Sequence, residues 1–382
     1  VGSEMCIRDR NGARGRHSTS QNRSGTEPIG RTTDRPDHGW DGVLRSVIPM
    51  SEVDATHTPP SGPRWGMTIP FDRVPLHEQR DWIVELADLG YTDVWSSEAN
   101  GADAFTPLAL AAAWSPSLRL GSAIVPAYTR GPALLAQSVA TMADAAPGRF
   151  AFGIGTSSNV IVERWNGMDF DEPYRQVKDM IGFLREAMTG EKVTGTYGCW
   201  DVHGFRLGIR PEQQPPILVG ALREGMLRLA GRVGDGAIIN WLSAEDVRTV
   251  APIVQAAGAG QPKEVVARIF VAPTTDRETV LNFGKVAIAA YLTVPVYAAF
   301  HEWMGRGDQL EQMWRCWSDG DRKAALEAIP DSLVDELIIS GTPDECREHI
   351  GRYVENGVTT PAIALLPFGY DARQAVRDLA PR

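Results

Sequence analysis

The sequence of this 382-residue chain predicts an α/β fold, a (β/α)8 TIM barrel. From Arg64 onward, short apolar runs alternate with longer amphipathic runs. Strands that alternate with helices imply right-handed crossovers and a parallel sheet. Eight such strand-then-helix units follow one another from Trp65. Eight repeats favour closure into a barrel over an open doubly wound sheet.

The first half of this alternation has clear helix boundaries. Between Leu76 and Leu89 apolar residues recur at helical spacing, and Gly90 then favours a helix end. Pro132 stands at the start of another helix, a position that tolerates proline well. We expect strands at 65–70, 92–96, 118–125 and 149–155, and helices at 76–89, 105–114, 132–145 and 174–188.

The second half contains the same units and two longer stretches. Residues 191–214 are rich in Gly, Tyr, Trp and Val, which predicts a small hairpin excursion. Residues 274–356 are too many for one crossover helix and predict a long, mainly helical insertion between strands 7 and 8, which walls the active site. We expect strands at 216–219, 237–240, 265–271 and 361–366, and helices at 223–233, 244–257 and 372–379.

The N-terminal stretch has a different composition from the rest. Residues 1–50 contain 8 Arg, no Lys and 6 acidic residues, and residues 10–41 offer almost nothing apolar to bury. Such a composition predicts disorder. We therefore expect a disordered or non-native leader at 1–63, with Met50 as a candidate true start, and a single barrel domain at 64–382.

Composition excludes several functional classes. The formal net charge is -10 and no basic run is interleaved with aromatic residues, so nucleic-acid binding is not expected. The four cysteines lie far apart, which favours a reducing, cytoplasmic compartment and predicts neither disulfides nor a metal site. The apolar run 286–300 is short and contains Pro295, so we expect a buried helix broken at the proline and no membrane span.

A glycine motif follows the fourth predicted strand. Gly153 and Gly155 half match a dinucleotide-binding fingerprint, but Ser158 takes the third glycine's place and the motif is not at the first strand. Two other interpretations stay open. The glycines permit a tight turn, or the backbone and hydroxyls of residues 155–158 hold a phosphate or another polar group of a ligand.

Five stretches in the same order resemble the bacterial-luciferase-like F420-dependent oxidoreductase family. They are YTDVWSSE at 91–98, LGSAIVPAYTRGP at 120–132, GRFAFGIG at 148–155, PPILVGA at 215–221 and AGRVGDGA at 230–237. The resemblance runs from about Trp65 to Pro367. The Tyr-Thr-Arg element within the second stretch is more similar to the deazaflavin enzymes than to the FMN monooxygenases.

The resemblance implies where a deazaflavin would lie. The family has a non-prolyl cis peptide in a bulge after the third strand, behind the cofactor ring, which corresponds here to Ser122–Ala123. Glu98 matches an acidic position that faces the cofactor, although a solvated loop carboxylate or a helix-capping partner is an equal alternative. The cofactor-binding residues implied in this way are Glu98, Ser122, Ala123, Ile124, Val125, Gly155, Thr156, Ser157, Ser158, Gly220, Ala221 and Leu222.

The catalytic acid is less clear from the sequence. Sugar-phosphate dehydrogenases of this family have a glutamate where this chain has Ser158, and a histidine after the acidic position, where it has Ala99 and Asn100, so that reaction is not expected here. Candidate proton donors are Glu98, Tyr128 and Ser158. His77, His203 and His301 are expected to be structural. The insertion supplies a candidate substrate pocket from Tyr291, Tyr297 and Trp303, while Trp314 and Trp317 fit helix-packing core better.

The resemblance implies hydride transfer between coenzyme F420 and a small or lipidic organic substrate. A monooxygenase that uses reduced FMN and oxygen is the first alternative. A barrel that binds a ligand without turnover is the second. A homodimer is the usual assembly in this family, and no nucleic-acid or membrane partner is expected.

Overall fold

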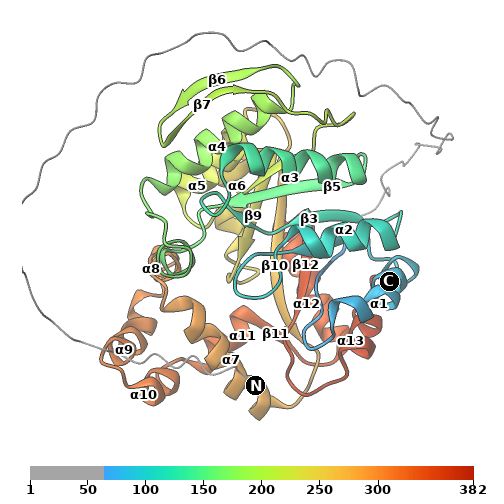
Figure 1. Cartoon of the computed structure of the whole chain (residues 1–382). Coiled ribbons are helices and arrows are strands. Elements are labelled where there is room, and N and C mark those ends of the chain that lie inside the picture. Colours follow the sequence, from blue (N-terminus) through green and yellow to red (C-terminus); the bar gives the residue numbers. More distant parts are fainter. Residues whose placement is uncertain (1–63) are drawn as a thin grey trace, which may run out of the picture. The chain divides into compact units, whose positions relative to one another are not determined.

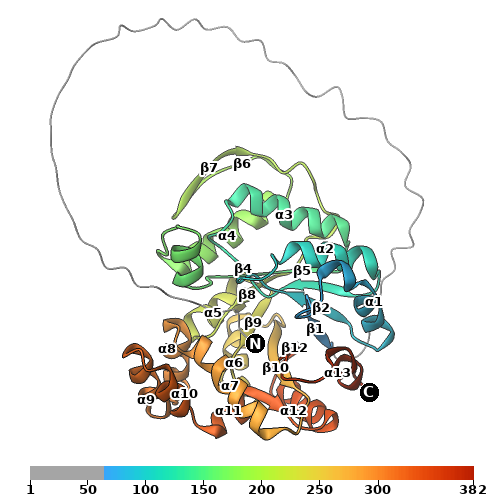
Figure 2. The same cartoon turned by 60° about the horizontal axis from the view of Figure 1, so that its bottom comes forward.

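The computed structural model describes residues 64–382, so the predicted leader at 1–63 lies outside the described residues. Eight parallel strands close into a barrel because β10 pairs with both β9 and β12 (Figures 1 and 2). The predicted (β/α)8 barrel is thereby confirmed. In order around the barrel, the strands are β1 (Gly66–Thr68), β2 (Asp93–Ser96), β3 (Arg119–Ser122), β5 (Phe150–Gly155), β8 (Ile217–Gly220), β9 (Gly236–Asn240), β10 (Glu264–Ala272) and β12 (Thr360–Leu365).

The helices of the outer layer lie close to their predicted positions. The predicted first helix is divided, because a 3-10 turn at Leu76–Glu78 precedes α1, and α6 begins later than expected. Pro132 is the first residue of α3. The helices are α1 (Arg80–Asp88), α2 (Phe105–Trp114), α3 (Pro132–Ala145), α4 (Pro173–Ala187), α5 (Glu224–Val233), α6 (Val247–Ala257), α12 (Pro343–Glu355) and α13 (Ala372–Asp378).

Two excursions depart from the simple repeat. The predicted hairpin forms as β6 (Val193–Tyr197) and β7 (Trp200–Phe205), which lie over α4 in Figure 1. Phe183 of α4 packs edge-on against the ring of Trp200 at 5.5 Å between centroids. Apolar side chains from the hairpin therefore attach it to the barrel's outer layer.

The long insertion is mainly helical, as predicted. It contains α7 (Arg277–Leu292), α8 (Pro295–Trp303), α9 (Gly307–Ser318), α10 (Arg322–Glu327) and α11 (Asp331–Leu337). The sequence interpretation missed β11 (Ile338–Ser340), which follows α11 without a loop and pairs with β10. Pro295 begins α8. Within residues 64–382, no single helix is long and apolar enough to cross a membrane, and α7 with α8 meets that test only as a pair bent by 101°.

The middle of the barrel is filled by one large side chain beside glycines. Trp95 of β2 is 1% exposed and belongs to an interior cluster with Ala151, Leu218 and Ile238. A Cβ atom on Gly121 of the neighbouring strand would fall 2.2 Å from the Trp95 ring. A large tryptophan therefore requires glycine next to it, and the interior below the mouth is packed core.

The N-terminal end of the barrel contains a closed ion-pair network. Arg119 donates to both carboxylate oxygens of Glu264 at 2.7 and 2.8 Å and to Asp93 at 3.2 Å, while Arg64 also pairs with Asp93. Burial alone would raise the pKa of Glu264, but the hydrogen bonds and charge of Arg119 lower it below its ordinary value. The buried charges at this end are therefore matched.

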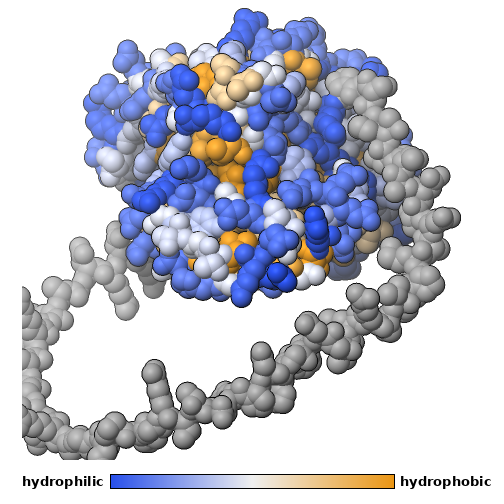
Figure 3. All heavy atoms as spheres, turned by 90° about the horizontal axis from the view of Figure 1, so that it is seen from above, coloured by the Kyte–Doolittle hydropathy of each residue, from blue (hydrophilic) through white to orange (hydrophobic). Residues whose placement is uncertain are grey.

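The outer surface of the described part is mainly hydrophilic on the face seen in Figure 3, with a hydrophobic area near its middle.

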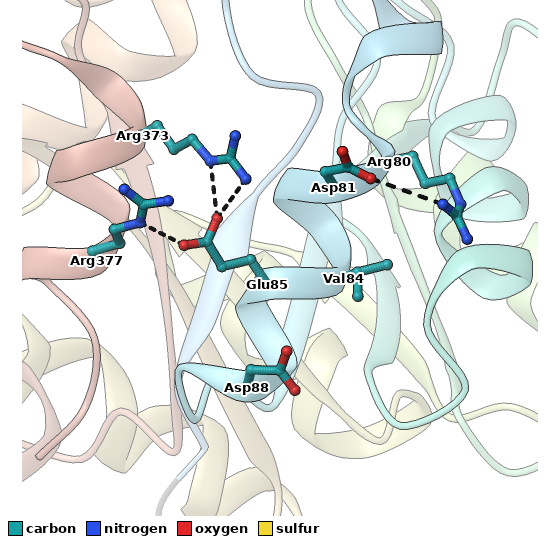
Figure 4. Close-up of a pocket in the computed structure, with 7 residues that line it drawn as sticks. All are labelled: Arg80, Asp81, Val84, Glu85, Asp88, Arg373 and Arg377. Carbon is teal, nitrogen blue, oxygen red and sulfur yellow. Dashed lines mark hydrogen bonds and ion pairs between the residues drawn. The ribbon is translucent and has the colours of Figure 1, made fainter.

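A hollow of about 410 Å³ lies on the outside, between α1 and α13 (Figure 4). Glu85 accepts hydrogen bonds from Arg373 and Arg377 there, and Asp81 and Asp88 add further negative charge. The cations of this hollow are balanced by carboxylates, and the residues that line it belong to α1 and α13.

Candidate active site at the C-terminal end of the barrel

A bulge interrupts the predicted third strand at the rim of the barrel. The strand is divided into β3 and a short β4 (Val125–Pro126), which pairs with β5. The non-prolyl cis peptide joins Ala123 to Ile124. The predicted bond, Ser122–Ala123, was therefore wrong by one residue. Ser122 still pairs with Ser96 in the sheet, so the regular strand continues through it and the bulge begins one position later.

Hydrogen bonds from both neighbouring strands hold the bulge. The Ala123 N–H donates to the carbonyl oxygen of Ser96 at 2.6 Å, and the Glu98 N–H donates to the carbonyl oxygen of Ile124 at 3.2 Å. The Ser122 hydroxyl donates to the Gly153 carbonyl oxygen and accepts from the Gly153 N–H. A Cβ atom on Gly153 would lie 2.0 Å from the Ser122 carbonyl oxygen, so only glycine fits behind the bulge.

The predicted ring-backing residues divide into two groups. Ser122 and Val125 are fully buried. The Ser122 hydroxyl is hydrogen-bonded to Gly153, and Val125 is paired with Ile154 in the sheet. Ala123 and Ile124 are half-buried and pack against the interior cluster at the mouth. Only the second group presents surface that a ligand is able to contact.

Glycine at two positions lets the Ile124 side chain pack against the ends of β5 and β8. A Cβ atom on Gly155 would lie 3.1 Å from Cγ1 of Ile124, and one on Gly220 would lie 3.1 Å from its Cγ2. The same constructed Cβ atoms lie 3.6 Å from the opposite glycine's Cα, so the ends of β5 and β8 meet at Ile124. Bare main chain beside a small bulge fits the close approach of a flat ring. The residues present therefore suit a flavin-type cofactor.

Hydroxyl groups follow directly after β5. Ser157 has a positive φ of 62°, and the Thr156 hydroxyl donates to the Ser157 carbonyl oxygen. The Ser158 hydroxyl accepts from the Ile161 N–H at 3.4 Å, at the start of a single π-helical turn (Val160–Trp165) that the sequence did not predict. All three hydroxyl residues are half-buried at the rim.

The end of β8 leads directly into a helix. Ala221 is buried and its N–H donates to the carbonyl oxygen of Ile238, whereas Leu222 is half-buried. The ten-residue helix α5 begins at Glu224. Its first turn directs backbone N–H groups toward the rim, as expected for an anionic group such as a phosphate.

Glu98 forms an ion pair that the sequence interpretation did not foresee. Its two carboxylate oxygens each accept a hydrogen bond of 2.6 Å from Arg130, and Oε1 also accepts from the Ala104 N–H. The Arg130 guanidinium lies over the Phe105 ring at 5.0 Å. A bidentate pair of this kind is strong and geometrically specific. Glu98 thus connects the loops after β2 and β4, next to the bulge whose carbonyl its own N–H contacts.

Tyr128 is also committed to a main-chain partner. Its hydroxyl donates to the carbonyl oxygen of Asp171 at 2.7 Å, and its ring packs against Phe170. Burial raises the pKa of Tyr128 above its ordinary value. The structure therefore does not bring Glu98, Tyr128 and Ser158 together as one group of proton donors.

Two of the predicted pocket tyrosines reach the mouth of the barrel. Tyr297 of α8 exchanges hydrogen bonds with the Asn240 side chain at the end of β9, at 3.1 and 3.3 Å. Burial raises the pKa of Tyr297 to about 12. Tyr291 packs against Tyr297 and against Trp241, which stacks on Phe270 at 4.0 Å. The insertion therefore covers this side of the mouth with aromatic rings.

The insertion's tryptophans are placed differently from these tyrosines. Trp303 is 38% exposed, and its ring contact is with Phe300. Trp314 donates to the Leu292 carbonyl oxygen and Trp317 lies under Arg322, and both pack against the insertion's own core. Trp303 thus joins neither Tyr291 nor Tyr297 in the aromatic contacts of the mouth.

The three histidines expected to be structural differ in their burial. His77 and His203 are exposed, whereas His301 is fully buried, and burial lowers the pKa of His301 to about 4. Among residues 64–382, no cluster of three or more His, Cys, Asp or Glu side chains is arranged to hold a metal ion.

The sequence interpretation missed three residues of the mouth: Asn240, Trp241 and Arg268. Asn240 and Arg268 are paired across β9 and β10 and so share the inner face. One signal was present in the sequence. A single charged residue interrupts the apolar run VVARIFV, which otherwise reads as a fully buried strand.

Comparison with known proteins agrees with this geometry. A 5,10-methylenetetrahydromethanopterin reductase of Archaeoglobus fulgidus is 26% identical over 309 residues, covering 78% of this chain and 92% of that protein. An F420-dependent glucose-6-phosphate dehydrogenase of Mycobacterium tuberculosis is 25% identical over 282 residues, covering 69% and 79%. The structure of the coenzyme F420 dependent tetrahydromethanopterin reductase of Methanopyrus kandleri superposes with a TM-score of 0.69 at 20% identity, covering 83% of this chain and 97% of the other.

The family model described as luciferase-like monooxygenase matches residues 50–360. The match includes the first seven barrel strands and the first residue of β12, together with the bulge and the glycine rim. The chain therefore belongs to the luciferase-like monooxygenase family.

Proposed function

We propose that this protein is an F420-dependent oxidoreductase that transfers a hydride between the deazaflavin and an organic substrate. The observation that carries the proposal is the half-buried bulge at Ala123–Ile124 with two bare glycines beside it, at the C-terminal mouth of the barrel. This is the end at which enzymes of this fold place their active sites. The F420-dependent glucose-6-phosphate dehydrogenase of Mycobacterium tuberculosis, to which the chain is similar, supports the choice of cofactor.

Each part of the rim has a proposed role toward that cofactor. Ile124 and the main chain of Gly155 and Gly220 would support the ring from behind. The hydroxyls of residues 156–158 would take polar groups of the chain that the ring carries, and residues 220–222 with the start of α5 would take its phosphate. When bound, the deazaflavin supplies a ring carbon that accepts or gives a hydride.

The chain's own residues orient the reactants and exclude water. We assign Glu98 to holding Arg130 and the bulge in place, since both of its oxygens already accept hydrogen bonds from a cation. Ser158 is the proton-donor candidate that we favour, because the Tyr128 hydroxyl already donates to Asp171. Tyr291 and Tyr297 would cover the substrate on the insertion side, where a dry site strengthens hydrogen bonds.

The assembly and compartment are part of the same proposal. We propose a homodimer, which is supported by the family resemblance. We also propose a location in the cytoplasm, which is supported by the unpaired thiols of Cys199, Cys316 and Cys346. Light scattering of the purified chain gives the mass directly. A monomer at micromolar concentration would contradict the dimer.

A spectral titration tests the cofactor. Purified protein is titrated with F420 and with FMN, and bound cofactor is followed by fluorescence. The proposal requires saturable F420 binding and, under anaerobic conditions, oxidation or reduction of bound F420 by some member of an organic substrate panel. Tight binding of FMN alone, with oxygen uptake when a flavin reductase is added, would favour the monooxygenase instead. F420 binding without turnover on a broad panel would favour a ligand-binding barrel.

A further inference from the structure

Arg268 is a half-buried cation at the mouth of the barrel without a protein partner. Its side chain makes no hydrogen bond or ion pair with any residue in 64–382, and its Nε is both shielded from solvent and unsatisfied. Its one described contact is with the Phe270 ring, at 5.1 Å from the guanidinium carbon. An N–H group that is shielded from solvent without a hydrogen-bond partner costs free energy, and proteins rarely keep one without a use.

The other shielded arginines of the described chain behave differently. Each arginine in 64–382 that is not exposed, apart from Arg268, donates to at least one carboxylate or carbonyl oxygen. These residues are Arg64, Arg119, Arg130, Arg149, Arg185, Arg306, Arg347 and Arg373. Arg268 is therefore the exception among comparable residues of the described chain.

The sheet register shows on which face of β10 the Arg268 side chain lies. Glu264, Val266 and Arg268 occupy every second position of β10 and therefore lie on the same face of the sheet. Val266 belongs to the barrel's interior cluster. Arg268 is thus on the inner face, level with Asn240 of β9. Asn240 exchanges hydrogen bonds with Tyr297, and the charge of Arg268 acts to lower the pKa of that tyrosine. Arg268, Asn240 and Tyr297 together form what we call the mouth triad.

We propose that the mouth triad binds a carboxylate group of the substrate, with Arg268 as the ion-pair partner. The planar guanidinium presents paired N–H donors that match a carboxylate. The register neighbours of Arg268 are the neutral residues Asn240 and Ala362, so the strands place no second cation beside it. At a half-buried site a single cation matches the charge of a monoanion, whereas a doubly charged phosphate would keep one charge unpaired. The inference rests on the proposed function only in using the same mouth for the substrate.

The test compares ligands that differ in charge. Isothermal titration calorimetry measures benzoate, benzyl alcohol and phenyl phosphate binding to the full chain, with and without bound F420. We expect benzoate to bind wild type about 10- to 100-fold more tightly than benzyl alcohol, because a charge-assisted hydrogen bond contributes on that scale. Phenyl phosphate should bind no more tightly than benzoate.

Three variants assign the preference to one residue. In Arg268→Met, benzoate should weaken about 10- to 100-fold while benzyl alcohol is unchanged. Arg268→Lys keeps the charge without the fork and should retain part of the preference, which guards against a misfolded methionine variant. Arg352→Met removes an exposed arginine of α12 that has no partner in 64–382 and should match wild type.

Several outcomes would overturn the proposal. They are the absence of benzoate binding to wild type, equal binding of benzoate and benzyl alcohol, an unchanged preference in Arg268→Met, or a strong preference for phenyl phosphate. Weaker F420 binding by Arg268→Met with benzoate binding unchanged would show that the anion belongs to the cofactor. Failure of the proposed function is separate, since it appears as no F420 binding by wild type, while the apoprotein still reports on benzoate.

Discussion

At the N-terminal end of the barrel strands, Arg119 lies between Asp93 and Glu264, whereas at the C-terminal end Arg268 faces no carboxylate. Glu264 and Arg268 belong to the same strand, β10, and point into the same interior. At one end every shielded charge has a partner within the protein. At the other, hydrogen-bonding groups and bare glycines remain available to ligands. The N-terminal end, which we call the closed end, thus stabilises the barrel. The C-terminal end, which we call the open end, keeps groups for binding that stability alone does not require.

The largest expected effect comes from breaking the ion-pair network at the closed end. Arg119→Met leaves Glu264 without its main partner in a shielded position, and we expect the free energy of unfolding to fall by about 3–5 kcal/mol. Urea denaturation followed by circular dichroism measures it. The matched control is Arg248→Met on the surface, expected within about 0.5 kcal/mol of wild type. A similar small change for both variants would remove the contrast between the two ends.

The next effect should come from filling the open end. In Gly220→Val, the added side chain meets Ile124 and occupies the space beside the bulge, so F420 binding should weaken by about 100-fold, or roughly 2.7 kcal/mol. Fluorescence titration gives the dissociation constant. Gly351→Ala in α12 has nothing within 4 Å of its new Cβ and serves as the control. Unchanged F420 affinity in Gly220→Val would place the ring elsewhere.

A smaller effect is expected from weakening the Glu98–Arg130 ion pair at the open end. Glu98→Gln turns an amide N–H₂ toward Arg130 and loses one charge-assisted hydrogen bond, which should cost about 1–2 kcal/mol of unfolding free energy. Because the Glu98–Arg130 pair holds the loop whose Glu98 N–H contacts the bulge, F420 affinity should fall together with stability. The comparison variant is Glu327→Gln, whose pair with Lys323 is exposed. Loss of turnover with stability and F420 affinity intact would instead identify Glu98 as the proton donor.

Acid should weaken the closed end before the open one. The pKa of Glu264 in the folded state lies below its ordinary value of 4.5, because the bonds from Arg119 outweigh the effect of burial. A lowered folded pKa contributes stability that is present above about pH 4.5 and is lost as the pH falls through the folded value. Urea denaturation from pH 7 to pH 3 should therefore show a shallower decline for Arg119→Met than for wild type. Parallel curves would contradict this assignment.

The smallest effect on stability is expected at Arg268. Arg268→Met removes a charge that has no partner among residues 64–382, so the unfolding free energy should stay within about 0.5 kcal/mol of wild type or rise. The same urea assay measures it. A loss comparable to that of Arg119→Met would mean that Arg268 supports the fold, and the distinction between the two ends would fail.

Much of the fold was predictable because it depends on local pattern. The helices at 105–114 and 132–145 have the predicted bounds, since apolar spacing and an initial proline act within a few residues. The short strand β11 was not predictable, because Ile338–Ser340 continues from a helix without a turn signal. The rim glycines were found through the resemblance, whereas the role of Arg268 depends on which neighbours the closed barrel brings to it.

The sequence by itself determined the alternation of strands and helices, the family motifs and the small residues at the rim. Only the tertiary structure decided that the cis peptide joins Ala123 to Ile124, that Glu98 is paired with Arg130 across 32 positions, and that Tyr297 reaches Asn240 across 57. Periodicity reports which side of an element is buried, because burial follows from the geometry of one helix or strand. It cannot report which charges meet, because barrel closure brings together segments that are distant in the chain.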